Sequence, residues 1–122
     1  MHCIGTDIIE ISRIAKALNR WGERFLNRIY TEPELELCKE NPARLASRFA
    51  GKEAVMKALG TGARGISWKE IEIVSEPSGK PVVRLYSKAR EKADVLGLNE
   101  LAISLSDSKE YAVAFVIAEA EN

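Results

Sequence analysis

The stretch RLASRFAGKEAVMKALGTG, residues 44–62, decides how the rest of the chain is interpreted. It predicts a helix over residues 43–59, because large apolar residues recur on one side at helical spacing. These residues are Leu45, Phe49, Met56 and Leu59. Gly60 can take the left-handed conformation that ends many helices, so the helix is expected to stop there and residues 61–65 to form a loop.

The segment after this loop predicts strands and one more helix. Alternating polar and apolar residues and turn signals place the strands at residues 68–75, 80–86, 101–106 and 111–118. Residues 76–79 join the first two strands, and residues 107–110 carry a hairpin signal between the last two. Between these pairs, Ser87 can cap a helix that runs to Leu96 and stops at Gly97.

The segment before residue 44 predicts a strand and two helices. Residues 3–9 are apolar except for Thr6 and Asp7, which suits a short strand. A helix is expected over residues 12–29, with a buried stripe made of Ile14, Leu18, Trp21, Phe25 and Ile29. Thr31-Glu32-Pro33-Glu34 has the pattern of a capping box and begins a short helix that ends near Asn41.

These elements predict an α+β fold in which a mostly antiparallel sheet packs against helices. The chain has 122 residues, the length of one domain, so residues 1–122 are expected to form a single unit. No apolar stretch approaches the ~20 residues that cross a bilayer, and no secretory signal is recognisable, so we expect no membrane partner and a cytoplasmic location.

The charge and the cysteines exclude other classes. The 18 basic and 18 acidic residues balance, which argues against a general nucleic-acid binder. Cys3 and Cys38 have no paired motif and His2 is the one histidine, so no Cys/His zinc site and no hydrolase triad can be built. Both cysteines are interpreted as small apolar residues. The helix over residues 12–29 nevertheless carries a basic stripe of Arg13, Lys16, Arg20, Arg24 and Arg28.

Several residues could carry chemistry. Asp7 lies among isoleucines, and a carboxylate there needs a partner or a metal; a helix N-cap or a salt bridge with Arg13 would also explain it. Glu53 and Lys57 are four positions apart and therefore neighbours on one helix face, which fits either a surface ion pair or a site. Lys52 projects near the apolar side of the same helix, where it could simply extend its amine to solvent.

One arrangement unites these residues. Asp7 and Glu53 are hard oxygen ligands on separate elements, and such ligands suit magnesium. Cationic Arg48, Lys52 and Lys57 around them would hold several phosphate charges. The residues therefore predict a magnesium site for a substrate that contains pyrophosphate.

Three blocks of the sequence resemble the signature blocks of the holo-[acyl-carrier-protein] synthases, a branch of the 4'-phosphopantetheinyl transferase family. The blocks are GTDIIE at residues 5–10, RFAGKEA with KALGTG at residues 48–54 and 57–62, and SLSDSKEYAVA at residues 104–114. Asp107 stands where many members of the family have histidine. The resemblance spans essentially the whole chain and implies the 4'-phosphopantetheinyl transferase fold.

The resemblance also implies roles for residues. Asp7 and Glu53 match magnesium ligands. The positions that match the surroundings of coenzyme A phosphates are Arg48, Lys52, Lys57, Gly60, Thr61, Gly62, Ser106 and Lys109. Arg13, Arg20 and Arg24 match the helix that docks the acyl carrier protein. The family forms a homotrimer with active sites at subunit interfaces.

The activity that this implies is Mg2+-dependent transfer of 4'-phosphopantetheine from coenzyme A to a serine of apo acyl carrier protein, with release of adenosine 3',5'-bisphosphate. Glu53 is the candidate base or only a metal ligand, and Lys57 would stabilise charge on the leaving group. A non-catalytic module that holds an acidic protein or a nucleotide through its basic helix is the alternative, and a purely structural oligomer is a third possibility.

Overall fold

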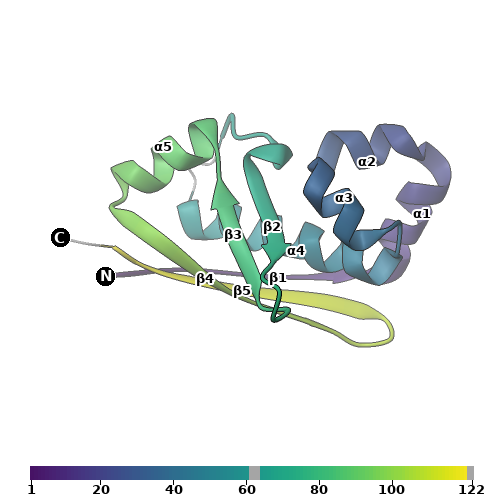
Figure 1. The fold of residues 1–122 in the computed structure, drawn as a ribbon. Coiled ribbons are helices and arrows are strands. Elements are labelled where there is room, and N and C mark those ends of the chain that lie inside the picture. Colours follow the sequence, from purple (N-terminus) through teal and green to yellow (C-terminus); the bar gives the residue numbers. More distant parts are fainter. Residues whose placement is uncertain (61–63, 121–122) are drawn as a thin grey trace.

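The computed structural model describes residues 1–60 and 64–120, and a three-stranded antiparallel sheet forms one outer layer of it, at the bottom of Figure 1. The strands are β1 (His2–Glu10), β4 (Leu98–Asp107) and β5 (Tyr111–Ala120), in the order β1-β5-β4. β5 is therefore the middle strand, and it pairs the beginning of the described chain with its last part, as in the pair Gly5 and Val116. The early strand and the late hairpin thus form one sheet.

The helix α4 (Pro42–Leu59) lies against the inner face of this sheet. The approach is very close at Gly5, where an added Cβ would lie 1.8 Å from the carbonyl oxygen of Ala54. On its other side α4 meets a two-stranded antiparallel sheet of β2 (Ile71–Ser75) and β3 (Pro81–Leu85). A Cβ added to Gly51 would lie 2.3 Å from Cδ1 of Ile73. Glycines therefore set the distance from α4 to each of its neighbours.

The remaining helices lie at the two ends of the molecule (Figure 1). One end is formed by α1 (Ile11–Trp21), α2 (Glu23–Ile29) and α3 (Glu32–Cys38), and the other end by α5 (Ser87–Val95). The expected α+β class and the packing of an antiparallel sheet against helices are confirmed. The capping box at Thr31 is confirmed too, since Thr31 Oγ1 accepts from the Glu34 amide and Glu34 Oε1 accepts from the Thr31 amide.

The prediction of one helix over residues 12–29 is wrong. Gly22 takes φ 54° and ψ −130°, which separates α1 from α2 and changes the direction of the chain. Trp21, predicted to be buried, is therefore 47% exposed, while Leu26 is buried in its place. The spacing of apolar residues did not reveal the break, because Phe25 and Ile29 continue the same spacing into α2.

Three smaller expectations also differ from the structure. Trp68–Glu70 forms a 3-10 turn (η2), and the strand begins only at Ile71. Ser87 makes no side-chain cap, because Tyr86 occupies the N-cap position of α5. Gly60 has φ 81° and ψ −166°, so it uses positive φ but not the left-handed helical conformation.

The outer face of the three-stranded sheet, which faces away from α4, is apolar and exposed. Its large side chains are Ile4, Ile8, Phe115 and Ile117, exposed by 55%, 63%, 44% and 36%. We call these four residues the outer sheet face. Among the described residues, no helix combines the length and the apolar composition needed to span a bilayer.

Candidate active site

Asp7 and Lys57 meet where β1 crosses the last turns of α4. Asp7 lies on the side of β1 that faces α4, as Gly5 and Ile9 do, and its side chain is 16% exposed. Lys57 Nζ donates to Asp7 Oδ1 and to the carbonyl oxygen of Thr6, both at 3.0 Å. Asp7 is therefore neither a helix N-cap nor a partner of Arg13, since its ion pair is with Lys57.

Glu53 lies one helical turn before Lys57 on the same side of α4. Burial raises the pKa of Glu53, and the negative charge of Asp7 raises it further, while Lys57 acts in the opposite direction. The two carboxyl groups are therefore close enough to repel each other. A cation between them would relieve this repulsion, so Asp7 and Glu53 fit the chemistry of a magnesium site.

The number of carboxylates also fits magnesium. Within residues 1–60 and 64–120, no group of three or more His, Cys, Asp or Glu side chains gathers at one place. Magnesium in proteins is commonly held by one or two carboxylates, with water and substrate phosphate as the other ligands. The pair Asp7 and Glu53 meets that requirement.

Arg48 and Ser106 lie in a different place. They line a hollow of about 240 Å³ together with Gly79, from the β2–β3 turn, and Asp107. One guanidinium nitrogen of Arg48 donates to Ser75 Oγ at 3.1 Å, and its buried Nε has no hydrogen-bond partner. Arg48 precedes Glu53 by five residues, which rotates it by about 140° around the helix axis. The structure thus separates these phosphate candidates from Asp7 and Glu53 within one chain.

The predicted role of Lys52 at a coenzyme A phosphate does not agree with its position. Its side chain is 0% exposed and forms an ion pair with Glu34, which is also 0% exposed, at 2.8 Å. The Lys52 amine also donates to the carbonyl oxygens of Trp68 and Ile71. All of its bonding capacity is used inside the protein, so no phosphate can reach it without disrupting this arrangement. Sequence reasoning did not identify Glu34, although it recognised the capping box that contains it.

The remaining phosphate candidates lie in loops. Gly60 is exposed at the end of α4, while Thr61 and Gly62 lie outside the described residues. Lys109 is exposed in the turn between β4 and β5. The turn itself is held by Ser108, whose Oγ accepts from the amides of Glu110 and Tyr111.

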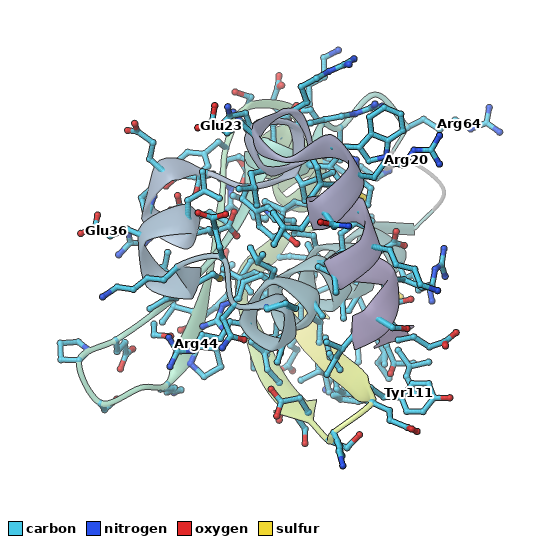
Figure 2. All side chains as sticks on the ribbon, turned by 90° about the vertical axis from the view of Figure 1, so that its right-hand side faces the viewer. Arg20, Glu23, Glu36, Arg44, Arg64 and Tyr111 are labelled. Carbon is cyan, nitrogen blue, oxygen red and sulfur yellow. The ribbon has the colours of Figure 1, made fainter. Side chains whose placement is uncertain are left out.

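The basic residues predicted to dock a carrier protein are all exposed. Arg13 and Arg20 lie on α1, and Arg24 lies on α2. The guanidinium groups of Arg20 and Arg24 lie 4.8 and 5.8 Å from the centre of the Trp21 ring. Figure 2 shows Arg20 projecting from the side of the molecule opposite Glu36. Exposed Trp21 and the guanidinium groups of Arg20 and Arg24 therefore share one surface beside the break at Gly22.

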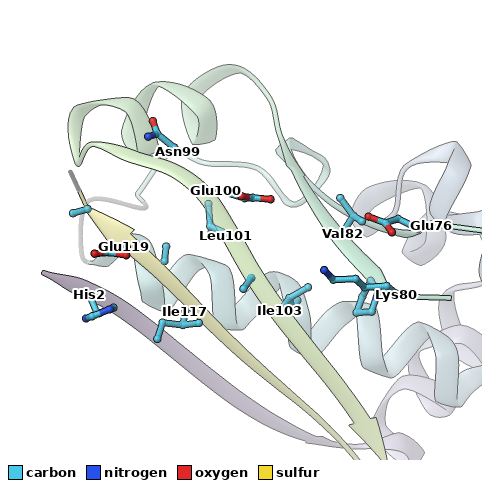
Figure 3. A pocket seen from close by; sticks show the side chains of 14 residues that line it. His2, Glu76, Lys80, Val82, Asn99, Glu100, Leu101, Ile103, Ile117 and Glu119 are labelled. Carbon is cyan, nitrogen blue, oxygen red and sulfur yellow. The ribbon is translucent and has the colours of Figure 1, made fainter. Parts of the chain in front are cut away.

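A wide hollow of about 1010 Å³ lies elsewhere, beside β3 and β4 (Figure 3). Lys80 and Val82 lie on its β3 side, and Leu101 and Ile103 lie along β4. None of the predicted site residues within the described ranges lines this hollow. Asp7, Glu53 and Lys57 lie instead where β1 crosses α4.

Comparisons with known proteins show the family and the fold. A family model described as "4'-phosphopantetheinyl transferase superfamily" matches residues 3–116. A holo-[acyl-carrier-protein] synthase from Dehalococcoides mccartyi (strain CBDB1) is 55% identical over 115 residues, which cover 94% of this chain and 96% of the relative.

Solved structures are similar over the same length. The crystal structure of Helicobacter pylori holo-[acyl-carrier-protein] synthase in complex with coenzyme A gives a TM-score of 0.85 at 37% identity, covering 95% of this chain and 99% of that chain. The holo-[acyl-carrier-protein] synthase of Neisseria meningitidis gives a TM-score of 0.83 at 40% identity, with 95% and 96% covered.

Proposed function

This chain belongs to the 4'-phosphopantetheinyl transferase superfamily, and on that premise we propose that it transfers the phosphopantetheine arm of coenzyme A to a serine of apo acyl carrier protein. The family and the fold expected from the sequence are confirmed, and so is the interpretation of the chain as an enzyme. Magnesium dependence, adenosine 3',5'-bisphosphate as the released product, the trimer and the roles of single residues are proposals. A cytoplasmic location stays a prediction.

The observation that carries the proposal is the meeting of Asp7, Glu53 and Lys57 at the contact of β1 with α4. Magnesium held by Asp7 and Glu53 would neutralise the charge that develops on the pyrophosphate oxygens. Lys57 is 55% exposed, so it can turn from Asp7 toward the same oxygens.

Glu53 is the residue proposed to handle the proton. The serine oxygen forms a bond to the phosphorus that bears pantetheine, and the bond from this phosphorus to the bridging oxygen breaks. The serine proton passes to the carboxylate of Glu53, which acts as the general base. Adenosine 3',5'-bisphosphate leaves with the bridging oxygen.

We propose that the site is completed by a neighbouring subunit in a homotrimer. Arg48 and Ser106 line their own hollow, away from Asp7 and Glu53 of the same chain, and Arg48 has an unsatisfied buried Nε. In a trimer, the hollow with Arg48 and Ser106 of one copy could lie beside Asp7 and Glu53 of the neighbouring copy. The outer sheet face supports this proposal, because four large apolar side chains exposed together favour burial against another chain.

The carrier protein would dock on the basic surface of α1 and α2. Arg13, Arg20 and Arg24 are exposed, and the Trp21 ring holds two of the guanidinium groups in place. An acidic helix on the carrier protein is the complementary partner.

Intact-mass spectrometry tests the proposed reaction. Purified protein, coenzyme A, magnesium and apo acyl carrier protein are mixed, and the carrier protein is weighed. A gain of one phosphopantetheine unit that disappears with EDTA is expected. An unchanged mass, beside a known synthase that modifies the same carrier protein, would favour the binding module that holds an acidic protein or a nucleotide without turnover.

A further inference from the structure

The ion pair between Lys52 and Glu34 is fully satisfied as well as fully buried. Glu34 Oε1 accepts from the Thr31 amide at 2.9 Å, and Glu34 Oε2 accepts from the Ile73 amide at 2.8 Å. Lys52 Nζ donates to the Trp68 carbonyl at 3.0 Å and to the Ile71 carbonyl. Each charged group therefore has hydrogen bonds in addition to the ion pair, which is the condition under which burial of two charges is tolerated.

These bonds connect α4 to three other elements. Lys52 belongs to α4 and Glu34 to α3, while Trp68 lies in η2 and Ile73 in β2. Hydrogen bonds are directional, so the Lys52 amine fits its partners in one orientation of α4 only. A slip of α4 by one turn would move the amine by about 5.4 Å and break all of them.

One side of α4 gives little control over such a slip or rotation. Its buried residues are Ala46, Ala50, Ala54 and Ala58, while the larger Leu45, Val55 and Leu59 are buried elsewhere on the helix. Alanines form only low ridges, so they interlock weakly with a neighbouring element. Gly51 adds no side chain at all on the face toward Ile73. The alanine side of the helix therefore interlocks weakly with its neighbours, and a buried ion pair is the kind of contact that fixes register.

We propose that Lys52 and Glu34 are positioning residues that set the rotation of α4 so that Glu53 faces Asp7. Lys52 and Glu53 are adjacent and therefore project about 100° apart around the helix. Anchoring Lys52 toward α3 and β2 directs Glu53 toward β1, where the charge of Asp7 acts on it. The consequence for catalysis rests on the proposed role of Glu53, but the geometric consequence does not.

The test is the double variant Glu34→Gln/Lys52→Met, which removes both charges while keeping the volumes. Lys52→Met alone would leave a buried carboxylate without its partner, which is strongly destabilising, so the double variant is the one that should fold. Leu45→Ala is the control, because it weakens the packing of buried α4 two turns away from Glu53 without touching the ion pair. Urea unfolding of the wild type, the double variant and Leu45→Ala shows how much stability each variant has lost.

We expect the double variant to lose 10-fold or more in kcat, with a smaller change in the KM for coenzyme A, because the ligand site survives but Glu53 is misplaced. Its Kd for Mn2+, measured by electron paramagnetic resonance of the free ion, should rise at least 10-fold. Leu45→Ala should keep its kcat and its Kd for Mn2+ within about 2-fold of the wild type, even if it is less stable than the double variant.

A crystal structure of the double variant decides the positioning role without any assay. A rotated or shifted α4, with Glu53 away from Asp7, supports it; the wild-type placement of Glu53 overturns it, as do a wild-type kcat and Mn2+ affinity. Asp7→Asn and Glu53→Gln report separately on the proposed function. If both bind Mn2+ as the wild type does, the metal site is wrong, and the crystal structure still tests the role of the ion pair.

Discussion

Asp7 and Glu53 repel each other across the contact of β1 with α4, and this repulsion should be visible in a titration. Replacing Asp7 by Asn removes the negative charge and also releases Lys57, so the pKa of Glu53 should fall toward the usual value of a glutamate. Carbon-13 NMR of the side-chain carboxyl group measures it. Asp107→Asn, on β4, should leave this pKa unchanged, and equal shifts in both variants would contradict the proximity of the two carboxylates.

Glu53 should be indispensable for transfer and dispensable for folding. Glu53→Ala is expected to lower kcat by at least about 1,000-fold, because one change removes a proposed metal ligand and the proposed base. The melting temperature should change little, since the side chain is half-buried and its like-charged neighbour is unfavourable. Glu36→Ala, at an exposed position of α3, is the matched control, and near-normal turnover in Glu53→Ala would refute the assignment.

At the scale of residues, the sequence predicted which side chains matter better than it predicted where they lie. The motif around Lys52 and Glu53 led to the expectation that both side chains belong to the active site. In the structure Lys52 is fully buried, while Glu53 is half-buried at the site. Adjacent positions on a helix differ by about 100°, and their environments depend on elements elsewhere in the chain. Glu34 is 18 positions from Lys52, so no local spacing could reveal their pairing.

At the scale of elements, the basic surface of α1 and α2 should act on the carrier protein alone. Arg20→Glu/Arg24→Glu is expected to raise the KM for the carrier protein at least 10-fold and to weaken its dependence on salt, while the KM for coenzyme A stays nearly the same. Steady-state kinetics at several salt concentrations measures the two KM values and the salt dependence of the KM for the carrier protein. Lys88→Glu/Lys92→Glu on α5 changes the net charge equally and serves as the control.

An equal rise in both KM values would mean that this surface contributes to the nucleotide site instead. Trp21→Ala is also informative, because the two guanidinium groups would lose the ring on which they rest. Its effect on the KM for the carrier protein should be smaller than that of charge reversal.

The contacts of α4 with its two neighbours should respond differently to added volume. Gly5→Ala is expected to cost about 3 kcal/mol or more, because the new Cβ meets the backbone of α4 at Ala54. Gly51→Ala meets Cδ1 of Ile73, which can rotate away, and alanine gains about 1 kcal/mol in a helix, so its net effect should be within about 1 kcal/mol. Urea unfolding measures the loss of stability in each variant. A larger loss in Gly51→Ala than in Gly5→Ala would contradict this packing.

The sequence predicted most elements because their signals are local. The capping box at Thr31 and the turn between β4 and β5 lie within a few residues of what they determine. The break at Gly22 escaped detection because the apolar spacing runs through it, and a glycine alone does not distinguish a helix interior from a corner. Ser87 likewise lies beside the N-cap position and not in it.

At the scale of the whole molecule, the outer sheet face should hold the proposed trimer together. Ile8→Glu/Phe115→Glu is expected to yield a monomer without transferase activity, because charges would be buried at the interface and each site would lack the neighbour's Arg48. Size-exclusion chromatography with light scattering gives the oligomeric state. Val95→Glu, an equally apolar and 80% exposed position on α5, should leave assembly and activity unchanged. A wild-type protein that is monomeric and active would refute the shared site.

The arrangement of the elements in space was the least predictable feature. The sequence placed a strand early and a hairpin late, but it did not show that β1 would pair with β5. This pairing requires that β5 offers a free edge to β1 and that both strands pack against α4. Neither condition can be read from the residues around Gly5 or Val116 alone.

The pairing of β1 with β5 also determines when the protein can mature during its synthesis. Residues 2–10 leave the ribosome about a hundred positions before their hydrogen-bonding partners, which are the residues from Tyr111 to Glu119. At about 5–20 residues per second, this strand waits on the order of 5–20 s without its hydrogen-bonding partner. Contacts this distant in sequence also slow the final folding step. The complete pairing of β1 with β5, which holds Asp7 in the sheet against α4, can therefore form only after Glu119 has been synthesised.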